Sequence, residues 1–343
     1  MTSMEETNTN STMTEIHDVE QGGSQSEFDV DQLGPMPTIL PSKQPYVQKE
    51  DEASSSDLRK TIFDHLNDTL KPTPATKAPK EALKAVYNAG IYKAGLPLNI
   101  LCVQSFQAGV FIAMAGHLFL AVGGGILGAA MFPTGLLAVV LTSAELFTGD
   151  SLVFVASVLG GKVSYKYLLR NWTVSWICNF VGCLTWAYFM AYLSDAVDDS
   201  GAHDLAVKVA YKKVNQTWGQ ILLKGMGANF MVCISVWQAT CAEEVAGKVL
   251  ALWFPVTGFV AMGFDHVIAN QFFIPLGMML GADISYKTLL FDALLPATIG
   301  NAIGGGLFVG AVYWYVFDSM NTQKAVMKSL RRLPTPSEVK RNS

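Results

Sequence analysis

Charged residues are scarce in this sequence. Asp, Glu, Lys and Arg together make up 15% of the 343 residues, whereas hydrophobic residues make up 50%. Residues 94–144, 51 positions in a row, contain none of the four charged types, although a bilayer-spanning helix needs only about 20 apolar residues. A large soluble domain requires a more polar surface than this composition supplies. The sequence therefore predicts an integral membrane protein.

Cysteine is scarce as well. The cysteines lie in or at the end of apolar segments and form no C-x-x-C pair (Cys102, Cys178, Cys183, Cys233 and Cys241). This placement is typical of small buried apolar residues and argues against a disulfide framework or a zinc site. We expect neither a metal site nor a cofactor.

The charges that do occur are divided unequally. Residues 1–70 hold 14 acidic and 4 basic side chains, while the remaining residues hold 14 acidic and 20 basic ones. Residues 1–81 are rich in Ser, Thr, Asn and Pro and lack periodicity, so they cannot bury enough apolar surface to offset the entropy of ordering. We predict a disordered acidic cytosolic tail over 1–81, a transmembrane domain over 82–318 and a basic cytosolic tail over 319–343. No apolar stretch follows basic residues at the start, so a cleaved signal peptide is not expected.

A short amphipathic pattern precedes the first apolar segment. Residues 81–92 carry Ala82, Leu83, Val86 and Tyr87 at helical spacing. The pattern favours a helix that lies on the membrane surface, with a simple linker as the alternative.

Seven charge-free segments follow, and two of them are interrupted. They cover approximately residues 94–122, 126–144, 171–194, 225–242, 249–264, 267–282 and 293–317. The second ends at a charged break, residues 145–150, and an apolar stretch resumes at 151–161. The fifth and sixth have 16 residues each and flank Asp265 and His266, too short for one crossing apiece. We predict an all-α membrane protein with six transmembrane helices, of which spans two and five are broken.

The two halves of this pattern resemble each other. NFVG at 179–182 in span three resembles NAIG at 301–304 in span six, and the breaks fall in corresponding spans. This spacing favours an inverted 3+3 repeat, and paired broken helices indicate a transport pathway near the bilayer midplane. Lys162, Lys166 and Arg170 follow span two and more basic residues follow span six, which predicts cytosolic termini. The long tail and the Asn215 glycosylation acceptor favour a plasma membrane.

His266 is the first candidate functional residue, because an intramembrane histidine is rare and costly to bury. Its alternative role is a plain hydrogen bond to a neighbouring carbonyl. We expect Asp265 to cap the half-helix that follows, with Thr148 and Asp150 in the equivalent part of the other break. His117 has no break beside it and is interpreted as structural.

Four runs of sequence resemble the formate/nitrite transporter family. They are AELFTGD at 144–150, KGMGANFMVCISVW at 224–237, GFDHVIANQFFIPLGM at 263–278 and LLPATIGNAIGGGLFVGAVYW at 294–314, and the likeness extends over about residues 81–316. The resemblance implies an aquaporin-like six-helix protomer that assembles as a homopentamer in the lipid bilayer. Each subunit would pass a small monovalent anion, such as formate, nitrite or lactate, together with a proton.

The resemblance also implies roles for individual residues. His266 and Thr148 match the family's mid-pore pair, and the family positions of the remaining pore residues fall on Phe132 and Phe259 (outer constriction), Leu136, Phe147 and Val232 (inner constriction), Asn229 and Asn301 (pore centre), and Lys224 with, less directly, Lys213 (vestibule). Asp265 stands where relatives often have Glu. Because rings of Phe, Leu and Val oppose a bare anion, we expect the anion to be protonated and to pass as a neutral acid. The sequence leaves open whether His266 donates that proton or stays neutral.

Three other functions are alternatives to an anion transporter. An aquaporin-like channel for neutral solutes would need two Asn-Pro-Ala motifs, and the chain has none. An intramembrane enzyme would need a paired acid, a Ser/His set or an HExxH helix, and Asp265 with His266 supplies none of these, so we do not expect an enzyme. A scaffold would recruit partners through its acidic tail, and the discriminating test is whether solute flux survives deletion of residues 1–75. We expect no nucleic-acid partner.

Overall fold

The computed structural model describes residues 59–64, 75–197, 201–318 and 324. Two units are distinguished, Met1–Lys71 and Pro72–Ser343. In the first unit, residues 59–64 form a short helix. Most of the predicted tails, 1–81 and 319–343, lies outside the described residues. In the second unit, all regular elements within the described ranges are helices, as expected.

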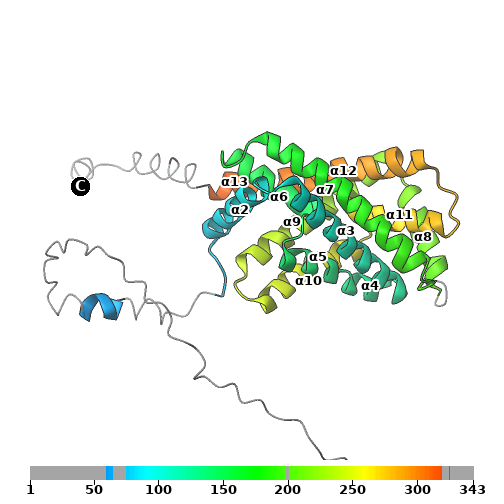
Figure 1. Cartoon of the computed structure of the whole chain (residues 1–343), viewed down its shortest axis with the longest axis horizontal. Helices are drawn as coiled ribbons and strands as arrows, with labels where there is room; N and C mark the ends of the chain where they lie inside the picture. Colours follow the sequence, from blue (N-terminus) through cyan, green and yellow to red (C-terminus); the bar gives the residue numbers. More distant parts are fainter. Residues whose placement is uncertain (1–58, 65–74, 198–200, 319–323, 325–343) are drawn as a thin grey trace, which may run out of the picture. The chain divides into compact units, whose positions relative to one another are not determined.

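The second unit consists of helices joined by short connections (Figure 1). In chain order they are α2 (Pro79–Ala94), α3 (Leu98–Ala121), α4 (Gly125–Met131), α5 (Pro133–Thr142), α6 (Phe147–Leu159), α7 (Tyr165–Thr185), the π-helical η2 (Trp186–Tyr192), α8 (Ala202–Val214), α9 (Trp218–Cys241), α10 (Val245–Ala261), α11 (Val267–Met279), the π-helical η3 (Thr288–Leu294), α12 (Leu295–Ala302), the π-helical η4 (Ile303–Ala311) and α13 (Val312–Phe317).

The long apolar helices match the predicted crossings. Within the described residues, five are long and apolar enough to span a membrane: Leu98–Ala121, Gly125–Thr142, Tyr165–Tyr192, Trp218–Cys241 and Thr288–Phe317. Shorter apolar helices form two interrupted spans. In one, α6 follows α5 after a break, and in the other, α11 follows α10 after a break.

Each interrupted span contains a non-helical segment. The first is residues 143–146, where Ser143 has a φ of 56°, and the second is residues 262–266, where Gly263 has a φ of 70°. The first break lies slightly earlier than expected, because α6 already begins at Phe147. Thr148 and Asp150 therefore lie in the first turn of α6 rather than in the break.

The amphipathic helix α2 packs on protein rather than lying free on a membrane surface. Its apolar face, which includes Ala82, Leu83 and Val86, is buried, and α2 lies beside α6 and α13 (Figure 1). The Tyr87 hydroxyl donates a hydrogen bond to Asp318 Oδ2 at 3.1 Å. Burial and this carboxylate raise the pKa of Tyr87 above its usual value. The expected position on the membrane surface is wrong because the bundle itself provides the apolar surface on which α2 packs.

The two halves of the bundle share helix lengths and spacing. Helices α3 and α9 have 24 residues each, and α6 and α11 have 13 each. In both pairs the second helix begins 120 positions after the first. Glycines allow close packing in both halves: a Cβ at Gly182 would lie 2.2 Å from the Phe106 carbonyl oxygen, and one at Gly304 would lie 2.1 Å from that of Met226.

We predict that Gly304→Ala destabilises the protein by about 1–3 kcal/mol, because the added methyl group must push η4 away from α9. The measurement is the midpoint of thermal unfolding of detergent-purified protein. The control is Gly219→Ala, since a Cβ there meets nothing within 4 Å. Equal midpoints for the two variants would contradict the close approach.

Candidate functional site

His266 and Thr148 meet between the two breaks. Thr148 lies in the first turn of α6 and His266 directly precedes α11. The Thr148 Oγ1 and His266 Nε2 atoms are 2.9 Å apart, and both side chains are buried. The structure thus brings together two predicted residues that are 118 positions apart in the sequence.

The other nitrogen of His266 caps helix α11. His266 Nδ1 accepts a hydrogen bond from the Ala269 backbone N–H at 3.1 Å, so Nδ1 carries no proton. In the neutral ring the proton then resides on Nε2, which donates to Thr148. The prediction that Asp265 caps α11 is wrong. The His266 imidazole occupies the capping position, and the Asp265 carboxylate accepts a hydrogen bond from Lys213 instead.

Two buried asparagines hold the breaks in place. Asn301 Oδ1 accepts from the Val267 N–H at 2.9 Å, and its amide donates to the carbonyls of Gly225 and Asp265. Asn179 Oδ1 accepts from the Phe147 N–H at 3.1 Å. Each asparagine thereby satisfies the first N–H of a half-helix, which has no partner within its own helix.

Further hydrogen bonds from Asn179 and from a third buried asparagine, Asn229, bind backbone carbonyls around the two breaks. The Asn179 amide donates to the carbonyls of Ser105 and Glu145. Asn229 donates to the carbonyls of Thr148 and Asn301 at 3.1 and 2.7 Å. Asn229 and Asn301, which we expected at the pore centre, are therefore close to His266 but act on backbone groups around it.

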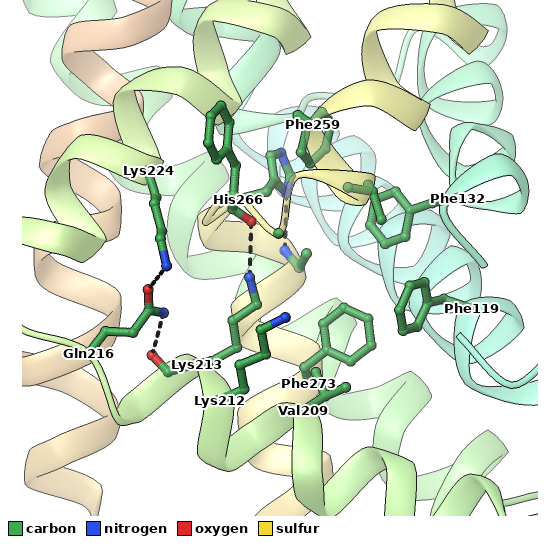
Figure 2. A pocket seen from close by; sticks show the side chains of 14 residues that line it. Phe119, Phe132, Val209, Lys212, Lys213, Gln216, Lys224, Phe259, His266 and Phe273 are labelled. Carbon is green, nitrogen blue, oxygen red and sulfur yellow. Dashed lines mark hydrogen bonds between the residues drawn. The ribbon is translucent and has the colours of Figure 1, made fainter. Parts of the chain in front are cut away.

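A cavity of about 100 Å³ opens beside His266. We call it the Lys213 vestibule; it is lined by Lys212, Lys213, Gln216, Lys224, Phe132, Phe259 and His266 among others. Lys213 Nζ contacts Asp265 Oδ1 at 2.9 Å and the Phe264 carbonyl at 3.0 Å. Gln216 links Lys224 to Asp265, since its carbonyl oxygen accepts from Lys224 and its amide nitrogen donates to Asp265 Oδ2. Figure 2 shows the side chains of Lys213, Gln216 and Lys224 on one side of the cavity and the rings of Phe119 and Phe132 on the other.

Two aromatic rings line this vestibule near His266. The ring centroids of Phe132 and Phe259 are 6.3 Å apart in an edge-to-face arrangement. Phe259 is also close to the imidazole, with 5.9 Å between the centroids of the Phe259 and His266 rings. The predicted pair therefore lies together, directly beside the predicted histidine.

A second cavity of about 200 Å³ lies at the other break. We call it the Lys93 vestibule; it is lined by Lys93, Glu145, Asp150, Leu136, Leu146 and Gly149 among others. Lys93 Nζ contacts Glu145 Oε1 at 2.5 Å and Asp150 Oδ1 at 2.9 Å. Asn171 donates to the remaining Glu145 oxygen at 2.8 Å.

The residues expected at the inner constriction do not line a single cavity. Leu136, Phe147 and Val232 are all buried in the hydrophobic cluster that also contains Phe132 and Phe259. Leu136 lines the Lys93 vestibule. The Phe147 ring packs against Trp172, with 5.6 Å between centroids, and lines a separate cavity, while Val232 lines neither vestibule. Their role as a constriction stays a prediction.

Sequence reasoning missed Lys93, Glu145 and Gln216, and it gave Asn179 no role. The spacing of the two halves contains the missing signal. Lys93 and Glu145 precede Lys213 and Asp265 by 120 positions each, and the two ion pairs have equal sequence separations of 52 residues. A self-comparison at that offset points to the second vestibule.

The comparisons with known proteins agree with this geometry. The sequence profile of the family described as "Formate/nitrite transporter" matches residues 80–315. The uncharacterized transporter YrhG of Bacillus subtilis is 36% identical over 266 residues, which cover 75% of this chain and 99% of YrhG. The probable formate transporter of Methanothermobacter thermautotrophicus is 35% identical over 267 residues, covering 70% of this chain and 97% of that protein. Formate channel FocA of Escherichia coli (strain K12) is 31% identical over 269 residues, covering 70% and 94%.

Solved structures give the same result. A pentameric formate channel with formate bound superposes with a TM-score of 0.51 and 31% identity, covering 70% of this chain and 99% of that one. An FNT family ion channel superposes with a TM-score of 0.65 at 24% identity, covering 68% and 98%, and supports the fold alone. The named relatives are transporters and channels rather than enzymes. Since the family profile covers nearly all of the helical unit, this chain belongs to the formate/nitrite transporter family and is a multi-pass integral membrane protein.

Proposed function

We propose that this protein conducts formate, or a similarly small monovalent anion, together with a proton. The observation that carries the proposal is the buried His266–Thr148 pair between two vestibules that each contain a lysine. The names of the relatives, a probable formate transporter and formate channels, support formate as the first substrate to test. A neutral-solute channel has no comparable support.

The proposed assembly is a homopentamer with a pore in each subunit, by analogy with the related pentameric formate channel. The two halves are proposed to be inverted, because each contributes three crossings. We further propose that both termini are cytosolic and that the protein resides in the plasma membrane. The Lys93 vestibule would then face the cytosol, on the side of α2 and α13.

Electrostatics favour entry of an anion into the Lys213 vestibule. Lys212, Lys213 and Lys224 line it, while the neighbouring carboxylate of Asp265 neutralises only one of them. A cleft lined by one sign of charge raises the local concentration of the opposite ion. The lysines therefore collect the anion outside the apolar zone.

The apolar zone selects for a neutral form of the substrate. Between Phe132 and Phe259 the anion would lose water without gaining ionic partners, at a cost of several kcal/mol. We infer that an anion in the Lys213 vestibule takes a proton from a hydronium ion, which leaves as water, passes as the neutral acid and releases the proton on the far side.

The proposed role of His266 in transport follows from its two hydrogen bonds. Nδ1 is occupied by the Ala269 N–H, so a second proton on the ring would break the cap of α11. We infer that His266 stays neutral and that its Nε2–H group, shared with Thr148, donates a hydrogen bond to the passing acid. The imidazole positions the acid and does not supply the proton.

We predict that His266→Asn lowers formate flux about tenfold or more, the effect of losing one buried hydrogen bond of about 1.4 kcal/mol. Asparagine is a good N-cap, so the thermal stability should remain near that of wild type, whereas His266→Ala should lose both flux and stability. The measurement is uptake of labelled formate into proteoliposomes under an imposed inward proton gradient, with nitrite and lactate as further substrates. Wild-type flux in His266→Asn would refute the imidazole's role, and no proton-driven flux in folded wild-type protein would refute the proposed function.

We predict that Lys224→Gln raises the apparent KM for formate several-fold with little change in maximal flux, because the lysine acts on local anion concentration. The difference from wild type should shrink at high ionic strength, where exposed charges are screened. Lys208→Gln is the matched control, since Lys208 lies on α8 but is exposed and lines neither vestibule. A KM that is unchanged in Lys224→Gln would contradict the funnel.

A further inference from the structure

The ion pairs formed by Lys213 and Lys93 differ by one carboxylate. In the Lys213 vestibule, the residue five positions after Asp265 is Asn270, whose amide donates to Asp265 Oδ1 at 3.2 Å. In the Lys93 vestibule, the residue five positions after Glu145 is Asp150, whose Oδ1 lies 2.9 Å from Lys93 Nζ. The ammonium group of Lys213 therefore faces one carboxylate, whereas that of Lys93 faces two.

The extra carboxylate is buried and only half satisfied. Glu145 and Asp150 are 0% and 2% exposed. Both oxygens of Glu145 have partners, Lys93 and Asn171, whereas Asp150 Oδ2 is buried without a hydrogen-bond partner. A buried charge without a counter-charge costs several kcal/mol, and two carboxylates that share one site do not both ionise.

The helices around Asp150 provide no second cation in the part of the chain that the structure describes. From α7, Arg170 is engaged with the carbonyls of Ala94 and Leu96. From α9, the nearby titratable group is the thiol of Cys233, which donates to the Thr148 carbonyl. Helices α11, α12 and η4, which also contact α6, contain no Asp, Glu, Lys, Arg or His, and α13 contributes only tyrosines. Lys93 and Glu145 are thus the charges that act on Asp150.

We propose that Glu145 and Asp150 together bind one exchangeable proton, in addition to their ion pair with Lys93. Asp150 Oδ2 is the atom that bears it, because it is the oxygen without another partner. Both carboxyl groups line the cavity, so vestibule water can exchange the proton. The Lys213 vestibule has no such site, since Asn270 cannot bind a proton in this way.

The location gives the bound proton a use, which rests on the proposed function. Asp150 lies two residues after Thr148, at the beginning of α6. When an anion such as formate enters from this vestibule, the O–H bond of Asp150 breaks and an O–H bond of formic acid forms. A hydronium ion from the compartment that this vestibule faces then reprotonates the carboxylate pair and leaves a water molecule. Transport from this side would depend on the pH of the compartment that the Lys93 vestibule faces.

The test is infrared spectroscopy of purified wild-type protein in lipid at neutral pH, in which protonated carboxyl groups absorb separately from carboxylates. We expect one protonated carboxyl per subunit that is lost in Asp150→Asn and retained in Asp265→Asn, the matched change in the other vestibule. Asn270→Asp should add a second one. If Asp150→Asn fails to fold, Glu145→Gln serves instead, since the remaining carboxylate then pairs with Lys93 and the band is likewise lost. A wild-type spectrum without the band, or a band that both variants retain, would overturn the proposal.

Proteoliposome flux separates this proposal from the proposed function. With the infrared band as expected but no formate flux in wild type, the proton site stands and the transport proposal fails. With flux but no band, the reverse holds. Where both are present, flux of wild type should change with the pH on the Lys93 side, and this dependence should be lost in Asp150→Asn while it persists in Asp265→Asn. A pH dependence that is identical in Asp150→Asn and wild type would overturn the proton's use in transport.

Discussion

The interaction on which the site depends is the hydrogen bonding of two asparagine side chains to interrupted backbone. Non-helical backbone at membrane depth is tolerated only where its polar groups are satisfied by protein or by a water-filled cavity. Asn179 and Asn301 each bind the first N–H of a half-helix and the carbonyl of the residue two positions before it. Without them, the start of α6 would lose its tie to α3 through Ser105, and the start of α11 its tie to α9 through Gly225.

The location of the breaks determines what the vestibules contain. Glu145 and Asp265 lie in the non-helical segments, and each contacts a lysine from 52 positions earlier in the chain. His266 caps the half-helix whose first N–H Asn301 binds. Backbone satisfaction, ion pairing and the orientation of the imidazole are therefore one arrangement, and a change at an asparagine would disturb all three.

The sequence predicted the long helices and both interruptions, because missing charge and short apolar lengths are local signals. It also placed His266 with Thr148 through the family resemblance. It did not show that His266 rather than Asp265 caps α11, since both residues precede the helix and only the direction of the side chains decides. Nor did it reveal Lys93, because that lysine lies in an amphipathic helix whose apolar face, in the folded protein, packs on α6. Pairings between distant residues depend on tertiary packing, which periodicity does not contain.

The two halves share the same helix arrangement and differ in the side chains next to the breaks. Leu146 occupies in the first half the position that His266 occupies in the second, and each directly precedes its half-helix. The first half therefore presents an apolar side chain to its vestibule, while the second presents a hydrogen-bond donor. Asp150 and Asn270 are also equivalent positions in the two halves. Here the first half, which lacks the histidine, has the acid, and the second half has an amide. A pore whose halves were identical would offer the same environment on both approaches; these two substitutions give one approach a fixed donor and the other an extra carboxylate.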